Sequence, residues 1–140
     1  MKTVVDTNVL VSGLISPHGP PGRIVDLLRE GVLQLVVDER ILWEYQDVLT
    51  RPQVTRYFTR EDMTTITDFF RHSSERIVPV HICGGLPDPG DIPFLEVAAT
   101  AGVALVTGNA RHFPVEERGA VCVQAPTEFL QEFRKRGGTG

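Results

Sequence analysis

Apolar residues along the chain fall into two alternating kinds of segment. Continuous apolar runs, which are typical of strands buried on both faces of a sheet, occur at residues 3–5, 33–37, 77–80, 103–106 and 120–123. Apolar residues at helical spacing, which predict amphipathic helices, occur at residues 9–15, 21–30, 39–50, 60–70, 92–101 and 126–134. Because strands alternate with helices, the pattern predicts the α/β class: a three-layer α/β/α sandwich around a mainly parallel five-stranded sheet.

Single residues mark where several of these elements begin and end. Asp38 and Thr59 are suited to cap the helices that follow them, and Thr59 has an acid three residues later. Gly102 follows the helix at residues 92–101 and is suited to end it. Pro79 lies inside the third apolar run. Because proline cannot donate a ladder hydrogen bond, we expect that strand at an edge of the sheet.

The length and composition fit one globular domain. At 140 residues the chain is long enough to bury a core, and its 41% hydrophobic and 23% charged residues are ordinary for a soluble protein. We expect a single domain over residues 1–136 and a flexible tail at residues 137–140. The sequence has no apolar run of membrane-spanning length, and because Asp6 lies so close to its start we expect no signal peptide. We therefore expect a cytoplasmic protein with no membrane partner.

Charge and cysteine content narrow the function classes. The formal net charge of −4 argues against a protein that is held to nucleic acid by its overall charge, although a local basic surface is compatible with it. Cys83 and Cys122 are far apart and show no C-x-x-C spacing. This argues against a zinc site made of thiolates and indicates idle thiols in a reducing compartment.

Polar residues follow the first and fourth predicted strands. Asp6, with Thr7 and Asn8 beside it, ends the first strand, and Thr107 to Asn109 end the fourth. In a parallel sheet the carboxyl ends of the strands lie along one rim, where ligands bind. Two interpretations of Asp6 remain open at this point. It is either a helix cap, a role that suits Asp, Thr and Asn alike, or a ligand or acceptor group in a site.

Two further acids are expected near the same rim. Glu44 lies at the border of the apolar face of its helix, three residues after Ile41 and four before Val48. Its carboxylate either looks toward the sheet or belongs to a surface glutamate that happens to lie near this border. Asp91 begins the helix that leads into the fourth strand, where a capping role alone would also explain it. Carboxylates that converge repel one another, and a divalent cation relieves this repulsion. An all-oxygen set suits Mg²⁺ or Mn²⁺ better than zinc.

Together these residues resemble the pattern of the PIN-domain family. The resemblance rests on residues 4–10 (VVDTNVL), on Glu44, on Asp91 at a helix start and on residues 105–109 (LVTGN), in this order and over about residues 2–134. It implies a metal-dependent ribonuclease, and small single-domain members are commonly the toxins of VapBC-type toxin–antitoxin pairs. The partners that it implies are an RNA substrate, a cognate antitoxin protein and a second copy in a homodimer.

The resemblance also assigns roles to residues of this chain. It implies that a metal-activated water hydrolyses the RNA phosphodiester bond. The catalytic acids that would hold Mg²⁺ or Mn²⁺ are Asp6, Glu44 and Asp91. The residues that would support the site, by orienting the acids or a water, are Thr7, Asn8, Thr107 and Asn109.

The chain departs from the family pattern in one place. A fourth acid usually follows the threonine at the end of the fourth strand, but the segment TGNARHF contains none, and Asn109 offers only an amide oxygen. We therefore expect one firmly held metal, with Asp88 as an additional candidate ligand from its loop. Arg111 and Arg23 are candidates for contacts to the RNA backbone, because arginine and lysine commonly bind phosphates. His112 is interpreted as an ordinary loop histidine.

Other functions compete with the nuclease. A phosphatase of the haloacid dehalogenase class also begins with an apolar run and an Asp, but Asn8 stands where its second Asp belongs. That class and receiver-like signalling domains also need a lysine, and this chain has none between Asp38 and Lys135. The missing fourth acid leaves a non-catalytic alternative: a PIN-like module that binds RNA or a partner with little or no catalysis.

Overall fold

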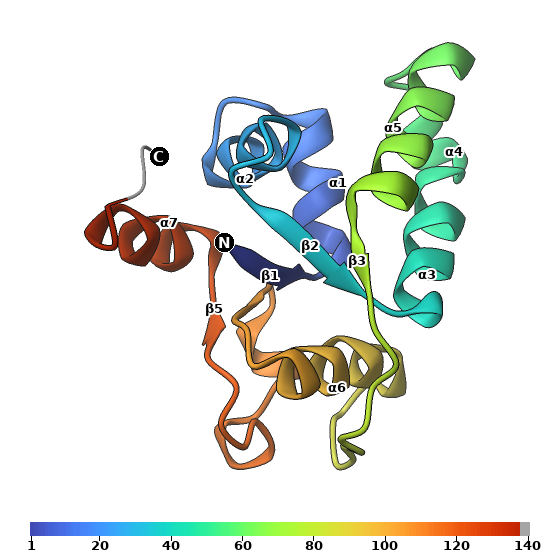
Figure 1. The fold of residues 1–140 in the computed structure, drawn as a ribbon. Helices are drawn as coiled ribbons and strands as arrows, with labels where there is room; N and C mark the ends of the chain where they lie inside the picture. Colours follow the sequence, from blue (N-terminus) through green and yellow to red (C-terminus); the bar gives the residue numbers. More distant parts are fainter. Residues whose placement is uncertain (138–140) are drawn as a thin grey trace.

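The structure is a computed structural model that describes residues 1–137, and its centre is a five-stranded sheet (Figure 1). The strands are β1 (Lys2–Val5), β2 (Gln34–Val37), β3 (Glu75–Arg76), β4 (Leu105–Val106) and β5 (Val123–Gln124). Their order is β3-β2-β1-β4-β5, and every neighbouring pair is parallel. The predicted parallel sheet is thus confirmed. Of the predicted tail, residues 138–140 lie outside the described residues.

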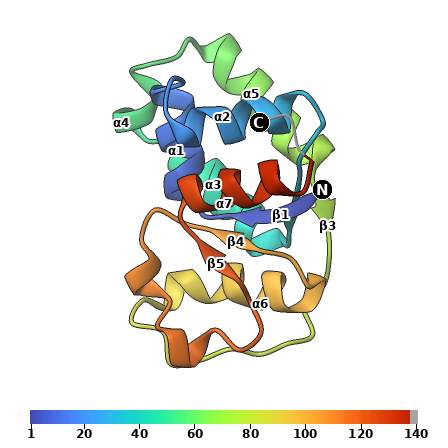
Figure 2. The same cartoon turned by 90° about the vertical axis from the view of Figure 1, so that its left-hand side faces the viewer.

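Helices cover both faces of this sheet. Within residues 1–137 the α-helices are α1 (Thr7–Ile15), α2 (Pro20–Arg29), α3 (Glu39–Leu49), α4 (Pro52–Thr55), α5 (Arg60–Ser73), α6 (Ile92–Ala101) and α7 (Pro126–Lys135). Short 3-10 helices are η1 (Pro89–Asp91), η2 (Ala110–His112) and η3 (Val115–Glu117). Helix α6 covers one face, α1, α2 and α7 cover the other, and α3 and α5 stand beside the β2–β3 edge (Figures 1 and 2). None of the described helices is long and apolar enough to cross a membrane.

The central strands are buried on both faces, as their continuous apolar runs predict. Val4 and Val5 of β1 and Leu105 and Val106 of β4 are 0% exposed. The register pairs Val4 with Leu105 and Val5 with Val106, and the amide of Asp6 donates to the carbonyl of Val106 at 2.8 Å. The residues that follow the paired ends are therefore brought side by side, which positions the first part of the site.

The third strand differs from its prediction over residues 77–80. β3 is instead Glu75–Arg76, paired with the end of β2, and the chain leaves the sheet after the amide of Ile77 donates to Val37. Pro79 lacks the N–H that would continue the ladder. The amide of Val80 donates instead to Thr100 Oγ1 of α6, at 3.0 Å. The predicted edge position is confirmed. The fourth and fifth strands are shorter than predicted, and α4 was not predicted.

Helices α1 and α2 cross in close contact. A Cβ atom added at Gly13 would lie 2.4 Å from the carbonyl oxygen of Pro21, and one added at Gly22 would lie 2.1 Å from that of Pro17. Both glycines therefore allow backbone to approach where a side chain would prevent it. This contact fixes the helix that begins directly after Asp6.

Candidate active site

Asp6 lies at the end of β1 and holds the N-cap position of α1, but its side chain makes no cap hydrogen bond. The carboxylate accepts instead from Thr107 Oγ1 of the neighbouring strand end, at 2.8 Å. Asp6 is 5% exposed and Thr107 is fully buried. Of the two interpretations of Asp6, capping by the side chain is wrong, and the carboxylate is directed toward the rim.

Glu44 is joined to the same rim through Thr7. It lies on α3 and is half-buried, and Thr7 Oγ1 at the start of α1 donates to Glu44 Oε2. Of the two orientations open to Glu44, the inward one is confirmed. Thr7 therefore connects the segment that carries Asp6 to the helix that carries Glu44.

Asp91 is the last residue of η1 and precedes α6. It is 8% exposed, and like Asp6 it stands at an N-cap position without a cap hydrogen bond from its side chain. Its Oδ2 lies 3.1 Å from Nδ1 of His112, on η2. The interpretation of His112 as an ordinary loop residue is therefore wrong. Because 21 residues separate the two, no local spacing indicated the contact.

The acids lie near enough to affect one another's pKa values. Burial raises the pKa of Asp6 to about 6, the hydrogen bond from Thr107 opposes this rise, and the charge of Asp91 adds to it. Burial also raises the pKa of Glu44, to which the charges of Asp6 and Asp88 contribute. The pKa of Asp91 is raised by burial and then by the charge of Asp88. Each acid thus makes its neighbours harder to ionise, as expected of carboxylates gathered at one site.

A family model described as PIN domain matches residues 2–111 of this chain. The chain belongs to the PIN-domain family. PIN domains are generally metal-dependent nucleases and use divalent metal ions. The family agrees with what the geometry offers, since acids from separate segments meet at the carboxyl rim of a parallel sheet.

Similar proteins extend over most of this PIN domain. An uncharacterized protein of Methanocaldococcus jannaschii is 29% identical, over 96% of this chain and 93% of that protein. The solved structure of VapBC2 from Rickettsia felis, bound to a DNA fragment from its promoter, is similar with a TM-score of 0.58 and 17% identity, over 89% of this chain and 98% of the other. The solved structure of VapBC-1 from nontypeable Haemophilus influenzae is similar with a TM-score of 0.59 and 14% identity, over 91% of this chain and 99% of the other. At these identities the solved structures show the fold.

The donor set of this PIN domain fits a hard divalent cation. The side chains that face the rim are carboxylates and hydroxyls, which Mg²⁺ and Mn²⁺ accept as ligands, and a cation would relieve the mutual repulsion of the acids. Among residues 1–137, however, no three His, Cys, Asp or Glu side chains are grouped closely enough to hold an ion as they stand. The acids nevertheless have the chemistry that such an ion needs.

The remaining predicted residues surround the acids in different ways. Asn8 Oδ1 accepts from the amide of Gly108 at 3.2 Å, which fixes the turn after β4. The amide of Asn109 donates to Thr107 Oγ1 at 3.0 Å, whereas its side chain is exposed. The exposed Asp88 caps η1, because its Oδ1 accepts from the amide of Gly90 at 2.9 Å. The structure thus places Asp88 within electrostatic reach of the other acids but gives its side chain a structural contact of its own.

The two arginines proposed for RNA contacts lie in different surroundings. Arg111 is exposed on η2, directly before His112. Arg23 lies on α2, where its guanidinium is 3.7 Å from the carboxylate of Glu30. Of the two arginines, Arg111 is therefore the one placed next to the candidate site, because His112, its neighbour in the chain, contacts Asp91.

Tyr45 lies directly beside the candidate site, although the sequence pattern did not single it out. It is 2% exposed, and its hydroxyl donates to the carbonyl of Val5 at 2.5 Å, directly before Asp6. Burial raises the pKa of Tyr45 well above its ordinary value, and the charges of Asp6 and Glu44 add to the effect. The sequence did contain a signal for this contact: a tyrosine stands where an aliphatic residue would suit the buried face of the helix. A buried tyrosine hydroxyl usually has a hydrogen-bond partner.

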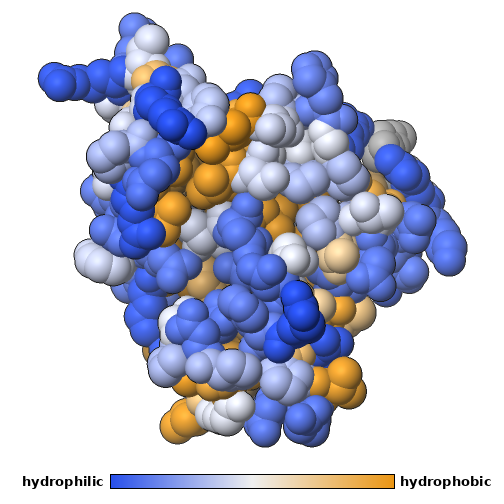
Figure 3. Space-filling model, turned by 180° about the vertical axis from the view of Figure 1, so that it is seen from behind, coloured by the Kyte–Doolittle hydropathy of each residue, from blue (hydrophilic) through white to orange (hydrophobic). Residues whose placement is uncertain are grey.

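Among the grooves that the described residues form, two lie beside α5 and outside the acid cluster. One, of about 540 Å³, runs between α3 and α5 and includes Trp43, which is 68% exposed. The other, of about 560 Å³, lies between α1, α2 and α5 and is lined mainly by apolar side chains that include Leu14, Ile66 and Phe69. Figure 3 shows apolar surface in the hollow beside the projecting α4–α5 arm.

Proposed function

We propose that this PIN domain is a Mg²⁺- or Mn²⁺-dependent endoribonuclease that hydrolyses RNA phosphodiester bonds. The observation that carries the proposal is the arrangement of Asp6, Glu44 and Asp91. These acids come from three separate segments, face one rim, and raise one another's pKa values in a way that a bound cation would reverse. Helix capping does not explain Asp6 or Asp91, because neither uses its side chain to cap a helix.

In this proposal Asp6, Glu44 and Asp91 hold the ion, and their hydroxyl neighbours orient them. When bound, Mg²⁺ or Mn²⁺ would lower the pKa of a water and stabilise charge on a phosphodiester oxygen. Thr107 fixes the carboxylate of Asp6 and Thr7 fixes that of Glu44. The positive charge of Arg111 serves to hold the RNA backbone, because phosphates are commonly bound by arginine.

The proposed biological setting is the cytoplasm, with the chain as the toxin of a toxin–antitoxin pair. Both similar solved structures are VapBC structures, which supports an antitoxin partner. The groove between α1, α2 and α5 offers such a partner an apolar surface, with Arg29 and Asp62 at its margin. We also propose a homodimer that uses the α3–α5 face, where Trp43 is exposed.

The proposal is tested by cleavage of single-stranded RNA in Mn²⁺ and in EDTA, with Asp91→Asn as the inactive reference. Cleavage should require the ion, should be lost in the variant, and should be suppressed by the protein encoded next to this gene. Purified protein that is free of any antitoxin, yet binds no Mn²⁺ and leaves RNA intact, would overturn the nuclease assignment. RNA binding without cleavage would instead support a binding module, which the amide at Asn109 favours because it supplies no fourth negative charge.

Asn109→Asp is expected to increase the affinity for Mn²⁺ by about tenfold, because it adds a charged oxygen ligand at the end of β4. In EDTA the same variant should be slightly less stable than the wild type, since a further carboxylate joins those that already repel one another. Calorimetric titration with Mn²⁺ and thermal unfolding in EDTA measure the two effects. Asn109→Ser, which adds no charge, is the control; if both variants bind Mn²⁺ alike, charge at this position has no role.

Thr107→Val is expected to move the acidic limb of the cleavage–pH profile to higher pH. The hydrogen bond from Thr107 favours the ionised form of Asp6, so its loss raises the pKa of that carboxyl further. An ion must then displace a more tightly held proton. Initial cleavage rates between about pH 5 and about pH 8, a range that extends about one unit or more to each side of the Asp6 pKa of about 6, measure the shift. Thr64→Val removes a hydroxyl that bonds only within α5 and serves as control; equal profiles would contradict the prediction.

A further inference from the structure

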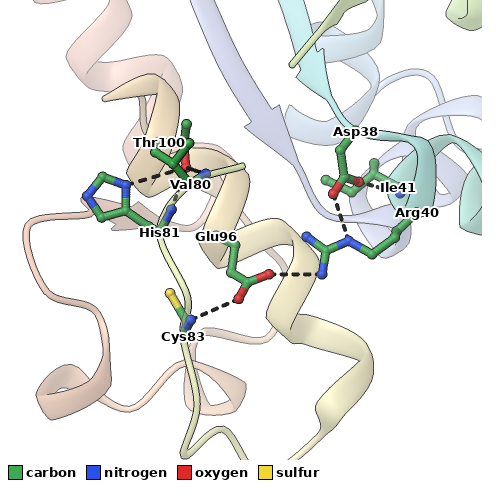
Figure 4. A network of polar contacts seen from close by, with 8 residues as sticks. All are labelled: Asp38, Arg40, Ile41, Val80, His81, Cys83, Glu96 and Thr100. Atoms are coloured by element: carbon green, nitrogen blue, oxygen red, sulfur yellow. Dashed lines mark hydrogen bonds and ion pairs between the residues drawn. The ribbon is translucent and has the colours of Figure 1, made fainter. Parts of the chain in front are cut away.

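Glu96 carries a buried charge that contacts two other segments (Figure 4). It lies on α6 and is 7% exposed. One carboxylate oxygen, Oε1, is 2.9 Å from Nη1 of Arg40 at the start of α3, and the other, Oε2, accepts from the amide of Cys83 at 2.9 Å. A buried carboxylate needs such partners, because burial without them is costly. In Glu96 each carboxylate oxygen has a different partner.

Every segment that meets at Glu96 also carries an acid of the candidate site. Arg40 lies four residues before Glu44 on α3, so the two side chains stand on the same side of that helix. The loop bound to the other oxygen leads to Asp88, and α6 itself begins directly after Asp91. The contacts of Glu96 thus join α3, which carries Glu44, to the segment that carries Asp88 and Asp91.

Arg40 is itself held from both sides. Its Nε donates to Asp38 at 2.7 Å, and Asp38 caps α3 by accepting from the amide of Ile41 at 2.9 Å. The Arg40 side chain is 46% exposed, whereas that of Glu96 is 9% exposed. Glu96 is therefore the buried member of the pair. The guanidinium of Arg40 links it to the first turn of α3.

The acids of the site carry like charges, and their repulsion tends to separate α3 from α6. The Arg40–Glu96 contact opposes this separation near the point where it arises. We propose that Glu96 is a positioning residue that holds α3 against α6 and so limits how far the repulsion of the acids separates Glu44 from Asp91. This inference rests on the proposed function, because it assigns Glu96 a role in forming the same metal site.

Glu96→Gln tests the proposal. Glutamine retains the size of the side chain and an oxygen that can accept from the amide of Cys83, but it removes the charge that faces Arg40. We expect Mn²⁺ affinity, measured by calorimetry, to fall by about ten- to hundredfold, as is typical when a residue that orients metal ligands is lost. The turnover rate at saturating Mn²⁺ should stay close to that of the wild type, because the acids are unchanged. Arg40→Lys should weaken Mn²⁺ binding to a smaller degree, since an ammonium group cannot reproduce the two-sided contact of the guanidinium.

Glu75→Gln is the matched control. It breaks an ion pair with Lys2 of similar length, 2.9 Å, that involves neither α3 nor α6, and its Mn²⁺ affinity should equal that of the wild type. If Glu96→Gln binds Mn²⁺ as tightly as the wild type does, Glu96 has no positioning role. If Glu96→Gln does not fold, unchanged affinity in Arg40→Lys overturns the proposal instead. A wild-type protein that binds no Mn²⁺ and cuts no RNA overturns the proposed function, which is a distinct result.

Discussion

Asp6→Asn is expected to abolish RNA cleavage while making the metal-free protein more stable at neutral pH. Loss of a charged metal ligand should reduce the rate by at least about a hundredfold, the scale seen when one group that stabilises transition-state charge is removed. Stability should rise because the carboxylate of Asp6 is 5% exposed and is costly to ionise there. A site that loses activity as the fold gains stability is characteristic of functional carboxylates held together against their repulsion.

The sign of the stability change follows from the pKa of Asp6, which is about 6 in the folded chain against an ordinary value of 3.8. Between these values the folded chain binds more protons than the unfolded chain does, so the free energy of unfolding falls as pH rises from about 4 to about 6 and stays lowered above that range. Asparagine removes this loss, which corresponds to about 2–3 kcal/mol at pH 7.

Urea unfolding in EDTA at several pH values between about 4 and 8, the range set by the two pKa values, measures this effect. Glu132→Gln, which removes an exposed carboxylate that is 3.5 Å from Arg136, should leave the pH dependence unchanged and is the control. If Asp6→Asn unfolds with the same pH dependence as the wild type, the assignment of the raised pKa to Asp6 is wrong. Retained cleavage would remove Asp6 from the proposed metal site.

Gly22→Ala is expected to lower the free energy of unfolding by about 2–4 kcal/mol, because the new methyl group meets backbone and not a movable side chain. Its Cβ would lie 2.1 Å from the carbonyl oxygen of Pro17, so the backbone of the loop between α1 and α2 must move away from α2. Urea or thermal unfolding measures the loss.

Gly19→Ala provides the comparison for this glycine. Gly19 precedes α2 at its N-cap, and an added Cβ would lie 3.8 Å from Cδ of Pro21, an ordinary contact. We expect its cost to stay within about 1 kcal/mol, since alanine is only a poorer N-cap than glycine. If both variants lose the same free energy of unfolding, the close approach of the Pro17 backbone does not determine the effect at Gly22.

Sequence reasoning predicted those parts of the site that follow from periodicity and parallel pairing. Asp6 and Thr107 meet because each directly follows an apolar run, and the register aligns the ends of the two runs. Glu44 was located by its place on an amphipathic helix. The sequence alone did not distinguish among the acids that begin helices: Asp38 caps its helix, whereas Asp6 and Asp91 do not. Neighbours from other segments determine which of these carboxylates remains available.

Contacts between side chains on non-adjacent elements lay beyond such reasoning. No spacing indicated that His112 would meet Asp91 or that Arg40 would meet Glu96, since each pair is set by how separate elements pack. The third strand was misplaced for a different reason. Residues 77–80 have strand-like composition, but Pro79 and the hydroxyl of Thr100 direct them away from the sheet.

The strand order β3-β2-β1-β4-β5 has a consequence for when activity arises during synthesis of the chain. β1 pairs with strands from both halves of the sequence, and the hydrogen bond between Asp6 and Thr107 spans 101 residues. No nascent fragment that ends before Thr107 contains the complete site, and contacts of such long range form late in folding. Until the fourth strand has been made, the carboxylate of Asp6 therefore lacks the hydroxyl of Thr107 that orients it.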